Sequence, residues 1–213
     1  MAVAIGRHNL AHLAEQVLER LGDRESLFFG GRWYRSGEMY ERSTRIAGGL
    51  AALGLQPGDR AVVMMTNSPD VGMIYNALWR AGAAITPAIF LLSDHELEGI
   101  LRDSEARAVF TSPEFLPRVR AASVAAPSVE WIFCSGDVDG TASLDELASA
   151  APLPLVPRAD DDLAALMYTG GTTGRAKGVM LSHENLWRAG GASHAAGYVP
   201  GVNRSLVSLP LSR

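Results

Sequence analysis

The stretch from Met167 to His183, MYTGGTTGRAKGVMLSH, gathers the residue types that bind phosphate groups. Glycine lets the backbone approach a ligand closely, and successive backbone N–H groups in such a loop form a concave anion site. Threonine hydroxyls add hydrogen-bond donors, and a lysine adds a compact positive charge on a long stem. The residues that we expect to hold a polyphosphate are Thr169, Gly170, Gly171, Thr172, Thr173, Gly174 and Lys177.

Lys177 is the only lysine among the 19 Lys+Arg positions of the chain, and every other one is arginine. A chain with this preference for arginine keeps its one lysine inside the glycine-rich loop. A point charge with three rotatable donors suits a phosphate group, whereas arginine offers a planar fork. We therefore interpret Lys177 as a functional residue of the loop.

Two familiar phosphate-binding loops do not fit this stretch. A Walker loop needs G-x-x-x-x-G-K-[ST] before a helix, but here Gly178 follows Lys177 and the next segment is expected to be a strand. A dinucleotide fingerprint needs G-x-G-x-x-G at the start of a helix, and the glycine spacing differs. These residues alone do not exclude the alternative that the stretch is a flexible hairpin loop between two strands and binds no ligand.

The bulk composition sets limits on the class of protein. The chain has 213 residues, of which 47% are hydrophobic and 20% charged, as in ordinary soluble globular proteins. Its net charge of −4 argues against a nucleic-acid-binding surface. The single cysteine, Cys134, excludes an internal disulfide, and we expect a buried thiol. No signal-peptide pattern and no apolar run of about 18 residues is found, so we expect a cytoplasmic protein without an integral membrane segment.

Apolar strands alternate with amphipathic helices along the chain. Ser93 with Glu96, and Ser143 with Glu146, match the capping box that begins a helix, and Gly30–Gly31 between aromatic runs indicates a hairpin. This alternation predicts βαβ units, and therefore an α/β fold with a largely parallel sheet and flanking helices. Strands are expected at 61–65, 83–88, 106–111, 129–134, 163–168, 178–181 and 205–211. Helices are expected at 9–21, 36–53, 67–81, 93–103, 114–121, from 143, and at 183–195.

The segment YTGGTTGRAKGVMLSHENL closely resembles the phosphate-binding signature of the AMP-forming adenylating enzymes, which include acyl-CoA synthetases, luciferases and the adenylation domains of peptide synthetases. The usual form of that signature is Y-T-S-G-T-T-G-x-P-K-G-V-x-L-[ST]-H-x-N. Upstream, GLQPGDRAVVMMTNSPD, ALWRAGAAITPA and LSDHELEGILRDSEARAVFTSPE resemble further segments of the family, so the resemblance covers nearly the whole chain. This upstream pattern is more similar to the bacterial fatty-acid CoA ligases than to the peptide synthetases.

The chain departs from the family pattern at several positions. Gly170 stands where the family prefers serine, which removes one hydroxyl, and Ala176 stands where it prefers proline, which loosens the turn. The apolar run Ile89–Leu92 replaces a stretch that is often of the polar Asn-x-Arg type. Arg213 stands where the family commonly has the histidine of an L-P-L-[FS]-H segment, near the acyl site. These departures put the level of activity in doubt.

The resemblance implies a reaction and its cofactors. The resemblance implies that a carboxylate, expected to be a fatty acid, reacts with ATP to give an acyl-adenylate and pyrophosphate, and that coenzyme A then takes the acyl group as a thioester. Lys177 and the loop amides would stabilise the leaving pyrophosphate, Thr172 and Thr173 would position phosphates, and Mg²⁺ would neutralise the remaining charge. Lys177 is therefore the candidate catalytic residue, and no residue of this chain is expected to bind the metal.

The proline-rich stretch 150–162 is interpreted as a linker. We expect an N-terminal α/β subdomain at 1–158 and, at 159–213, the start of a second subdomain that carries the phosphate loop of an incomplete adenylating domain. The family's Y-G-x-T-E motif, ribose-binding aspartate and C-terminal catalytic lysine are not found in this sequence. We therefore expect an N-terminal portion of an adenylating enzyme, inactive alone, whether an artificial truncation, a proteolytic fragment or a prematurely ended gene product.

Other candidate residues favour packing or solvation. His183 is expected to cap or pack at a helix start, and the remaining histidines show no metal-ligand spacing. Asp160–Asp162 are interpreted as a solvated turn, and Tyr168 either packs or flanks the nucleotide. Two other functions stay open. One is a truncated, non-catalytic module that binds nucleotide weakly or pairs with another polypeptide, and an apolar surface exposed by the truncation would also favour self-association. The other is an unrelated phosphate-binding α/β protein.

Overall fold

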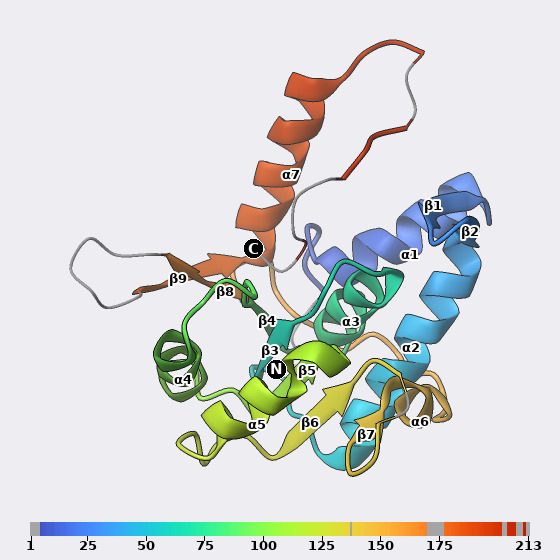
Figure 1. The fold of residues 1–213 in the computed structure, drawn as a ribbon. Coiled ribbons are helices and arrows are strands. Elements are labelled where there is room, and N and C mark those ends of the chain that lie inside the picture. Colours follow the sequence, from blue (N-terminus) through green and yellow to red (C-terminus); the bar gives the residue numbers. More distant parts are fainter. Residues whose placement is uncertain (1–4, 137, 170–176, 202–203, 208–210, 212–213) are drawn as a thin grey trace.

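The computed structural model describes residues 5–136, 138–169, 177–201, 204–207 and 211 (Figure 1). Within these ranges helices and strands alternate along the chain. The helices are α1 (Leu10–Leu21), α2 (Ser36–Leu53), α3 (Pro69–Arg80), α4 (Asp94–Asp103), the 3-10 turn η1 (Pro113–Phe115), α5 (Leu116–Ser123), α6 (Leu144–Ala148) and α7 (His183–Gly197). The strands are β1 (Glu25–Phe29), β2 (Arg32–Arg35), β3 (Arg60–Met64), β4 (Ala84–Pro87), β5 (Ala108–Thr111), β6 (Trp131–Cys134), β7 (Ala142–Ser143), β8 (Leu163–Thr169) and β9 (Lys177–Ser182).

Among the described residues, a seven-stranded sheet has the order β7-β6-β5-β3-β4-β8-β9, and β1 and β2 form a separate hairpin. The neighbouring strands from β7 to β8 are parallel, whereas β8 and β9 are antiparallel. Parallel neighbours need crossover connections, which α3, α4 and α5 supply. The predicted α/β fold with a largely parallel sheet is confirmed, and so is the hairpin at Gly30–Gly31.

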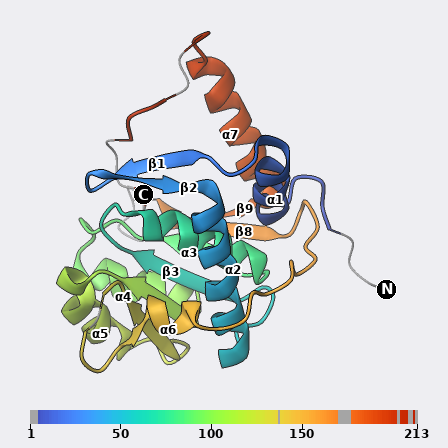
Figure 2. The same ribbon diagram turned by 90° about the vertical axis from the view of Figure 1, so that its right-hand side faces the viewer.

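Helices cover both faces of the sheet, which explains the uninterrupted apolar runs in its strands. Successive residues of a strand point to opposite faces, so Val62 and Val63 of β3 enter two different core clusters. Leu50 of α2 and Ile74 of α3 pack with Val63, and Leu97 of α4 packs with Val62. Figure 2 shows α2 running in front of the sheet, and both ribbon views show α7 projecting away from the body of the molecule.

The two predicted capping boxes are present. Ser93 and Ser143 accept from the backbone N–H three residues on, and their glutamate partners complete both predicted capping boxes. Ser182 caps α7 in the same way, with Asn185 as the partner. The predicted strand at 205–211 is wrong where the structure describes it, because residues 204–207 belong to no strand. Residues 208–210 lie outside the described ranges.

The stretch 150–162 is extended, as expected, but it lies against the helices of the first part of the chain. The Leu153 N–H donates to the Thr44 carbonyl at 2.9 Å, and the Val156 N–H donates to the Arg80 carbonyl at 3.0 Å. Beyond this stretch, β8 joins the same sheet as β4, with Ala165 opposite Ile85. The boundary near residue 158 therefore stays a prediction.

Candidate phosphate-binding hairpin

The predicted phosphate loop connects two paired strands. Antiparallel pairing of β8 with β9 ends at the pair Thr169–Lys177, so these two residues face each other across the base of the loop. Both are exposed. The residues between them lie outside the described ranges, and the roles predicted for Gly170, Gly171, Thr172, Thr173 and Gly174 stay predictions. The pairing places Lys177 where the chain leaves the loop, beside the threonine at which it enters.

Lys177 begins β9 and forms no ion pair with any other described residue. Arg188 of the neighbouring helix, by contrast, pairs with Glu184 at 2.6 Å, and Arg107 pairs with Asp59 at 2.7 Å. A cation that is paired in the free protein must give up its partner before it can bind an anion. Lys177 has no ion-pair partner among the described side chains, so it breaks no such pair when it binds an anion.

The base of the loop is packed on one side by Tyr168. Tyr168 lies opposite Gly178 in the strand pairing, and a Cβ atom added to Gly178 would lie 3.2 Å from Cζ of the Tyr168 ring and 2.9 Å from Cδ1 of Leu166. The phenol oxygen donates a hydrogen bond to Oδ2 of Asp103, the last residue of α4, at 2.6 Å. Burial above all, with this hydrogen bond second, raises the pKa of the Tyr168 phenol well above its ordinary value. The interpretation of Tyr168 as a packing residue therefore agrees with the structure.

The far end of the hairpin is held by His183, the first residue of α7. His183 is 1% exposed, and its Nδ1 accepts a hydrogen bond from the Leu10 N–H at 3.3 Å. Burial first and the positive charge of Arg158 second lower the pKa of His183 to about 4. The imidazole is neutral at pH 7 and accepts at Nδ1, which confirms its expected structural role.

Asp160 has a role that the sequence interpretation missed. Its carboxylate accepts from the His8 N–H at 2.6 Å and lies 3.1 Å from Nδ1 of the same histidine. The His8 ring also packs against Trp187 of α7, with ring centroids 4.2 Å apart. The predicted turn is present, but the Asp160 carboxylate is paired with His8 and joins the N-terminal segment to the hairpin. Residues 152 positions apart leave no local pattern from which this contact could have been inferred.

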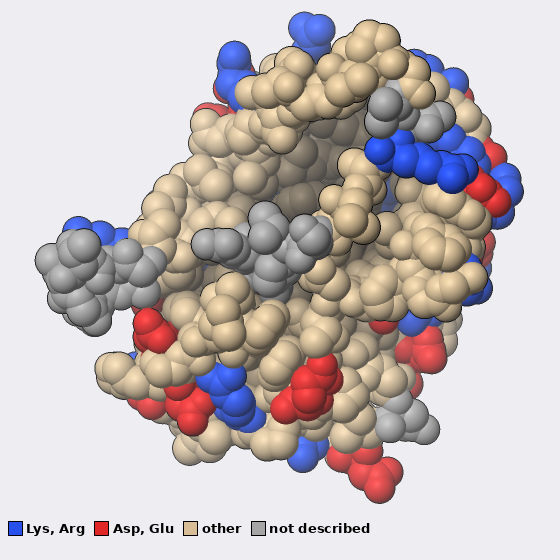
Figure 3. All heavy atoms as spheres, turned by 45° about the horizontal axis from the view of Figure 1, so that its top comes forward, with Lys and Arg blue, Asp and Glu red and all other residues tan. Residues whose placement is uncertain are grey.

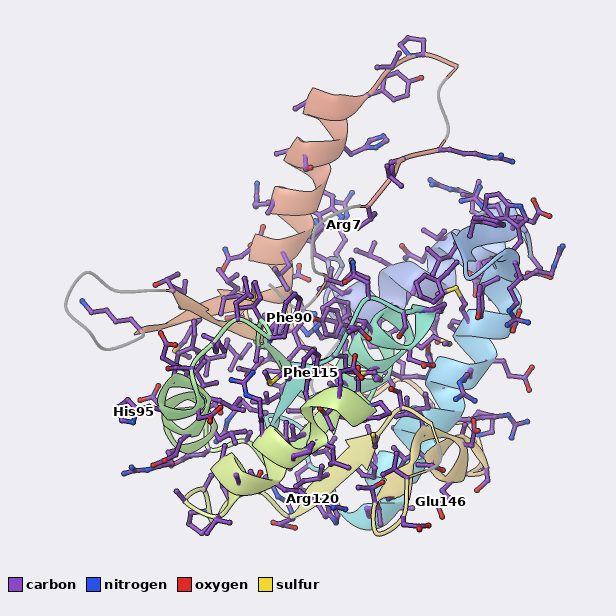
Figure 4. All side chains as sticks on the ribbon, viewed as in Figure 1. Arg7, Phe90, His95, Phe115, Arg120 and Glu146 are labelled. Carbon is purple, nitrogen blue, oxygen red and sulfur yellow. The ribbon has the colours of Figure 1, made fainter. Side chains whose placement is uncertain are left out.

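The apolar run Ile89–Leu92, where the family often has polar residues, folds over the start of α5. Phe90 stacks on Phe115 with ring centroids 5.7 Å apart and an angle of 2° between the planes, and Figure 4 shows the two side chains next to each other. Arg118 of α5 donates to the carbonyl oxygens of Phe90 and Leu92. Packing thus explains Phe90 and Leu92, which lie against the core beneath α4 and α5, whereas Leu91 is exposed.

The described residues contain no group of three or more His, Cys, Asp or Glu side chains that could hold a metal ion. The bound Mg²⁺ that the family resemblance implies stays a prediction, and no described residue is assigned as its ligand. In the same ranges, no helix is both long and apolar enough to cross a membrane.

Known proteins resemble this chain in sequence and in fold. The feruloyl-CoA synthase of Amycolatopsis sp is 38% identical over 157 residues, which are 74% of this chain and 30% of that protein. The long-chain-fatty-acid–CoA ligase of Bacillus subtilis is 29% identical over 200 residues, covering 78% of this chain and 35% of the relative. A crystal structure of a long-chain-fatty-acid-CoA ligase from Archaeoglobus fulgidus superposes with a TM-score of 0.79 at 28% identity, over 92% of this chain and 41% of that one.

The chain thus spans about a third of the length of the curated relatives that it matches. The family model that matches is described as AMP-binding enzyme, and the match runs over residues 13–212. That range contains the whole sheet, both helix layers and the hairpin with Thr169 and Lys177 at its base. Given this match, the resemblance read from the loop is established: the chain belongs to the AMP-binding enzyme family of adenylate-forming ligases.

Proposed function

We propose that this chain supplies the polyphosphate-binding hairpin of an ATP-dependent, AMP-forming acyl-CoA synthetase. The observation that carries the proposal is the pairing of Thr169 with Lys177 at the base of the loop, with the lysine unpaired among the described side chains. In the first step a carboxylate oxygen attacks the α-phosphorus of ATP, and pyrophosphate leaves. Lys177 and the amides of residues 170–174 hold the β- and γ-phosphates and stabilise the negative charge that develops on the leaving group.

In the second step the thiol of coenzyme A attacks the acyl carbonyl carbon, and AMP leaves. The carboxylate that we propose is a fatty acid, which the names of the Bacillus and Archaeoglobus relatives support. The feruloyl-CoA synthase similarity favours an aromatic acid as the competing class. ATP, Mg²⁺ and coenzyme A are part of the proposal through family membership, and the cytoplasmic location stays a prediction.

The isolated chain is expected to bind pyrophosphate but not to catalyse adenylation. A carboxylate-dependent ATP–pyrophosphate exchange assay on the 213-residue chain, with a fatty acid and with ferulate, should give no turnover. Calorimetry should detect binding of magnesium pyrophosphate, with inorganic phosphate binding more weakly because it occupies fewer donors. The Bacillus ligase is the positive control for exchange. Clear turnover by the chain would overturn its proposed inactivity, and failure to bind pyrophosphate would overturn the role of the hairpin.

A second candidate function, association with another polypeptide chain, is favoured by the apolar surface near the hairpin. Figure 3 shows a largely uncharged face with a hollow on the side of the molecule where α7 projects. The large apolar side chains exposed on β9, α7 and the described part of the segment after it are Val179, Met180, Trp187, Tyr198, Val199, Leu206, Val207 and Leu211. Exposed apolar patches of this kind mark association sites. We propose that the isolated chain associates with itself through them.

Analytical ultracentrifugation over a concentration series is expected to show dimers or larger species of the isolated chain. Met180→Glu should shift the population toward the monomer, because it places a charge at an exposed apolar position of β9. Leu91→Glu is the matched control, since Leu91 is 75% exposed but belongs to the segment after β4. A monomer at every concentration would rule out self-association.

A further inference from the structure

The loop that holds Lys177 is tied to a helix on the other side of β8. Tyr168 directly precedes Thr169, so it belongs to the last stretch of β8 before the loop. Because Thr169 and Lys177 are cross-strand partners, a shift of this end of β8 moves both residues that flank the loop. Any contact that holds Tyr168 in place therefore also holds the backbone of Lys177 in place, and with it the starting position of the lysine side chain.

Two contacts fix Tyr168. On the β9 side, its ring lies against Gly178, where an added Cβ atom would come within 3.2 Å of Cζ. A glycine opposite an aromatic residue lets the ring cover the neighbouring strand, which pins the register of the pair. On the other side, the phenol donates to Asp103 at 2.6 Å. The Tyr168 side chain thus connects β9, one residue after Lys177, with the end of α4.

Helix α4 is a firm anchor for this contact. Its inner face is buried through Leu97, Ile100 and Leu101, and its start is closed by a complete capping box. An aspartate as the last residue of a helix is electrostatically unfavourable, because the carbonyl end of the helix carries partial negative charge. The stability of α4 therefore does not explain an aspartate at position 103, whereas the hydrogen bond that its carboxylate accepts from Tyr168 does.

We propose that Tyr168 and Asp103 are a positioning pair, which ties the base of the phosphate loop to α4 and sets the placement of Lys177 toward a bound polyphosphate. The inference rests on the proposed function, because the pair affects binding only if Lys177 binds the polyphosphate. Neither residue touches the ligand in this proposal. The pair acts on Lys177 through the β8–β9 pairing.

The test compares Tyr168→Phe, Asp103→Ala and Asp103→Asn in the 213-residue chain. In the free protein, hydrogen exchange of the backbone amides at Thr169, Lys177 and Gly178 is expected to speed up in Tyr168→Phe. The affinity for magnesium pyrophosphate is expected to fall about three- to tenfold, which is less than for loss of a direct contact to a charged ligand, because the pair acts only through the placement of Lys177. Asp103→Ala should show the same faster exchange and the same loss of affinity as Tyr168→Phe. Asp103→Asn keeps an acceptor oxygen for the phenol, so its affinity should stay close to that of the wild type.

Tyr40→Phe is the matched control, because it removes another phenol-to-carboxylate hydrogen bond, from Tyr40 of α2 to Glu15 of α1 at 2.8 Å, which does not involve the hairpin. A melting temperature that stays constant while the affinity falls separates positioning from a general loss of stability. If Tyr168→Phe changes neither the exchange of these amides nor the affinity, while Lys177→Ala still weakens binding, the positioning pair is refuted and the proposed function stands. If Lys177→Ala also has no effect on binding, the proposed function fails, and the positioning of Lys177 fails with it.

Discussion

Replacing Lys177 with alanine is expected to weaken the binding of magnesium pyrophosphate by about 10- to 100-fold, the usual range for a lost hydrogen bond to a charged partner. Lys177 is exposed, and it has no ion-pair partner among the described residues, so its charge is available to a ligand in the free protein. Calorimetric titration of the 213-residue chain and of the variant measures the difference. The effect should diminish as salt concentration rises, because the charge is exposed.

Two control variants make this result specific. Lys177→Arg keeps the positive charge but replaces a point charge by a planar fork, and it should recover part of the affinity. Arg188→Ala removes a cation from the neighbouring helix that is already paired with Glu184, and it should leave the affinity unchanged. Equal losses in Lys177→Ala and Arg188→Ala would mean that only the general charge of this face matters. Lys177 would then lose its assigned role.

Local signals in the sequence were sufficient for most of the fold. The capping boxes at Ser93 and Ser143 are contacts between residues three positions apart, so they are visible in the sequence and appear as predicted. Continuous apolar runs such as that of β3 predict strands buried on both faces, and the structure has helices on both faces of the sheet. The strand predicted at 205–211 failed because apolar residues alone do not supply a partner strand.

Contacts between distant segments could not be predicted from one sequence. The extended stretch 150–162 packs through main-chain hydrogen bonds, such as that from Leu153 to Thr44, and these depend on no particular side chain. The hydrogen bond between Tyr168 and Asp103 joins residues 65 positions apart. At the candidate site, the residue types predicted the chemistry of the loop, but only the strand register placed Thr169 opposite Lys177.

Lowering the pH from 7 to 4 is expected to destabilise the protein by about 3 kcal/mol through His183 alone, the equivalent of a pKa drop from 6.5 to about 4. The ring is buried, its Nδ1 accepts from the Leu10 N–H, and it begins a helix, whose amino end disfavours positive charge. Protonation would remove the acceptor and bury a charge beside Arg158. The carboxylates of Asp160 and Asp162 oppose this effect only in part.

The sign of this pH effect follows from proton binding. Between pH 6.5 and about 4 the unfolded chain binds a proton at residue 183 that the folded chain does not, so stability falls as the pH falls through this window. Urea unfolding at pH 7 and pH 4.5 measures the change. His183→Asn keeps an acceptor oxygen for Leu10 but cannot titrate there, so its stability should fall less than that of the wild type. His95→Asn, at an exposed position on α4 (Figure 4), should retain the wild-type pH dependence. If His183→Asn loses as much stability as the wild type between the two pH values, the acid sensitivity lies in other groups and His183 is not its source.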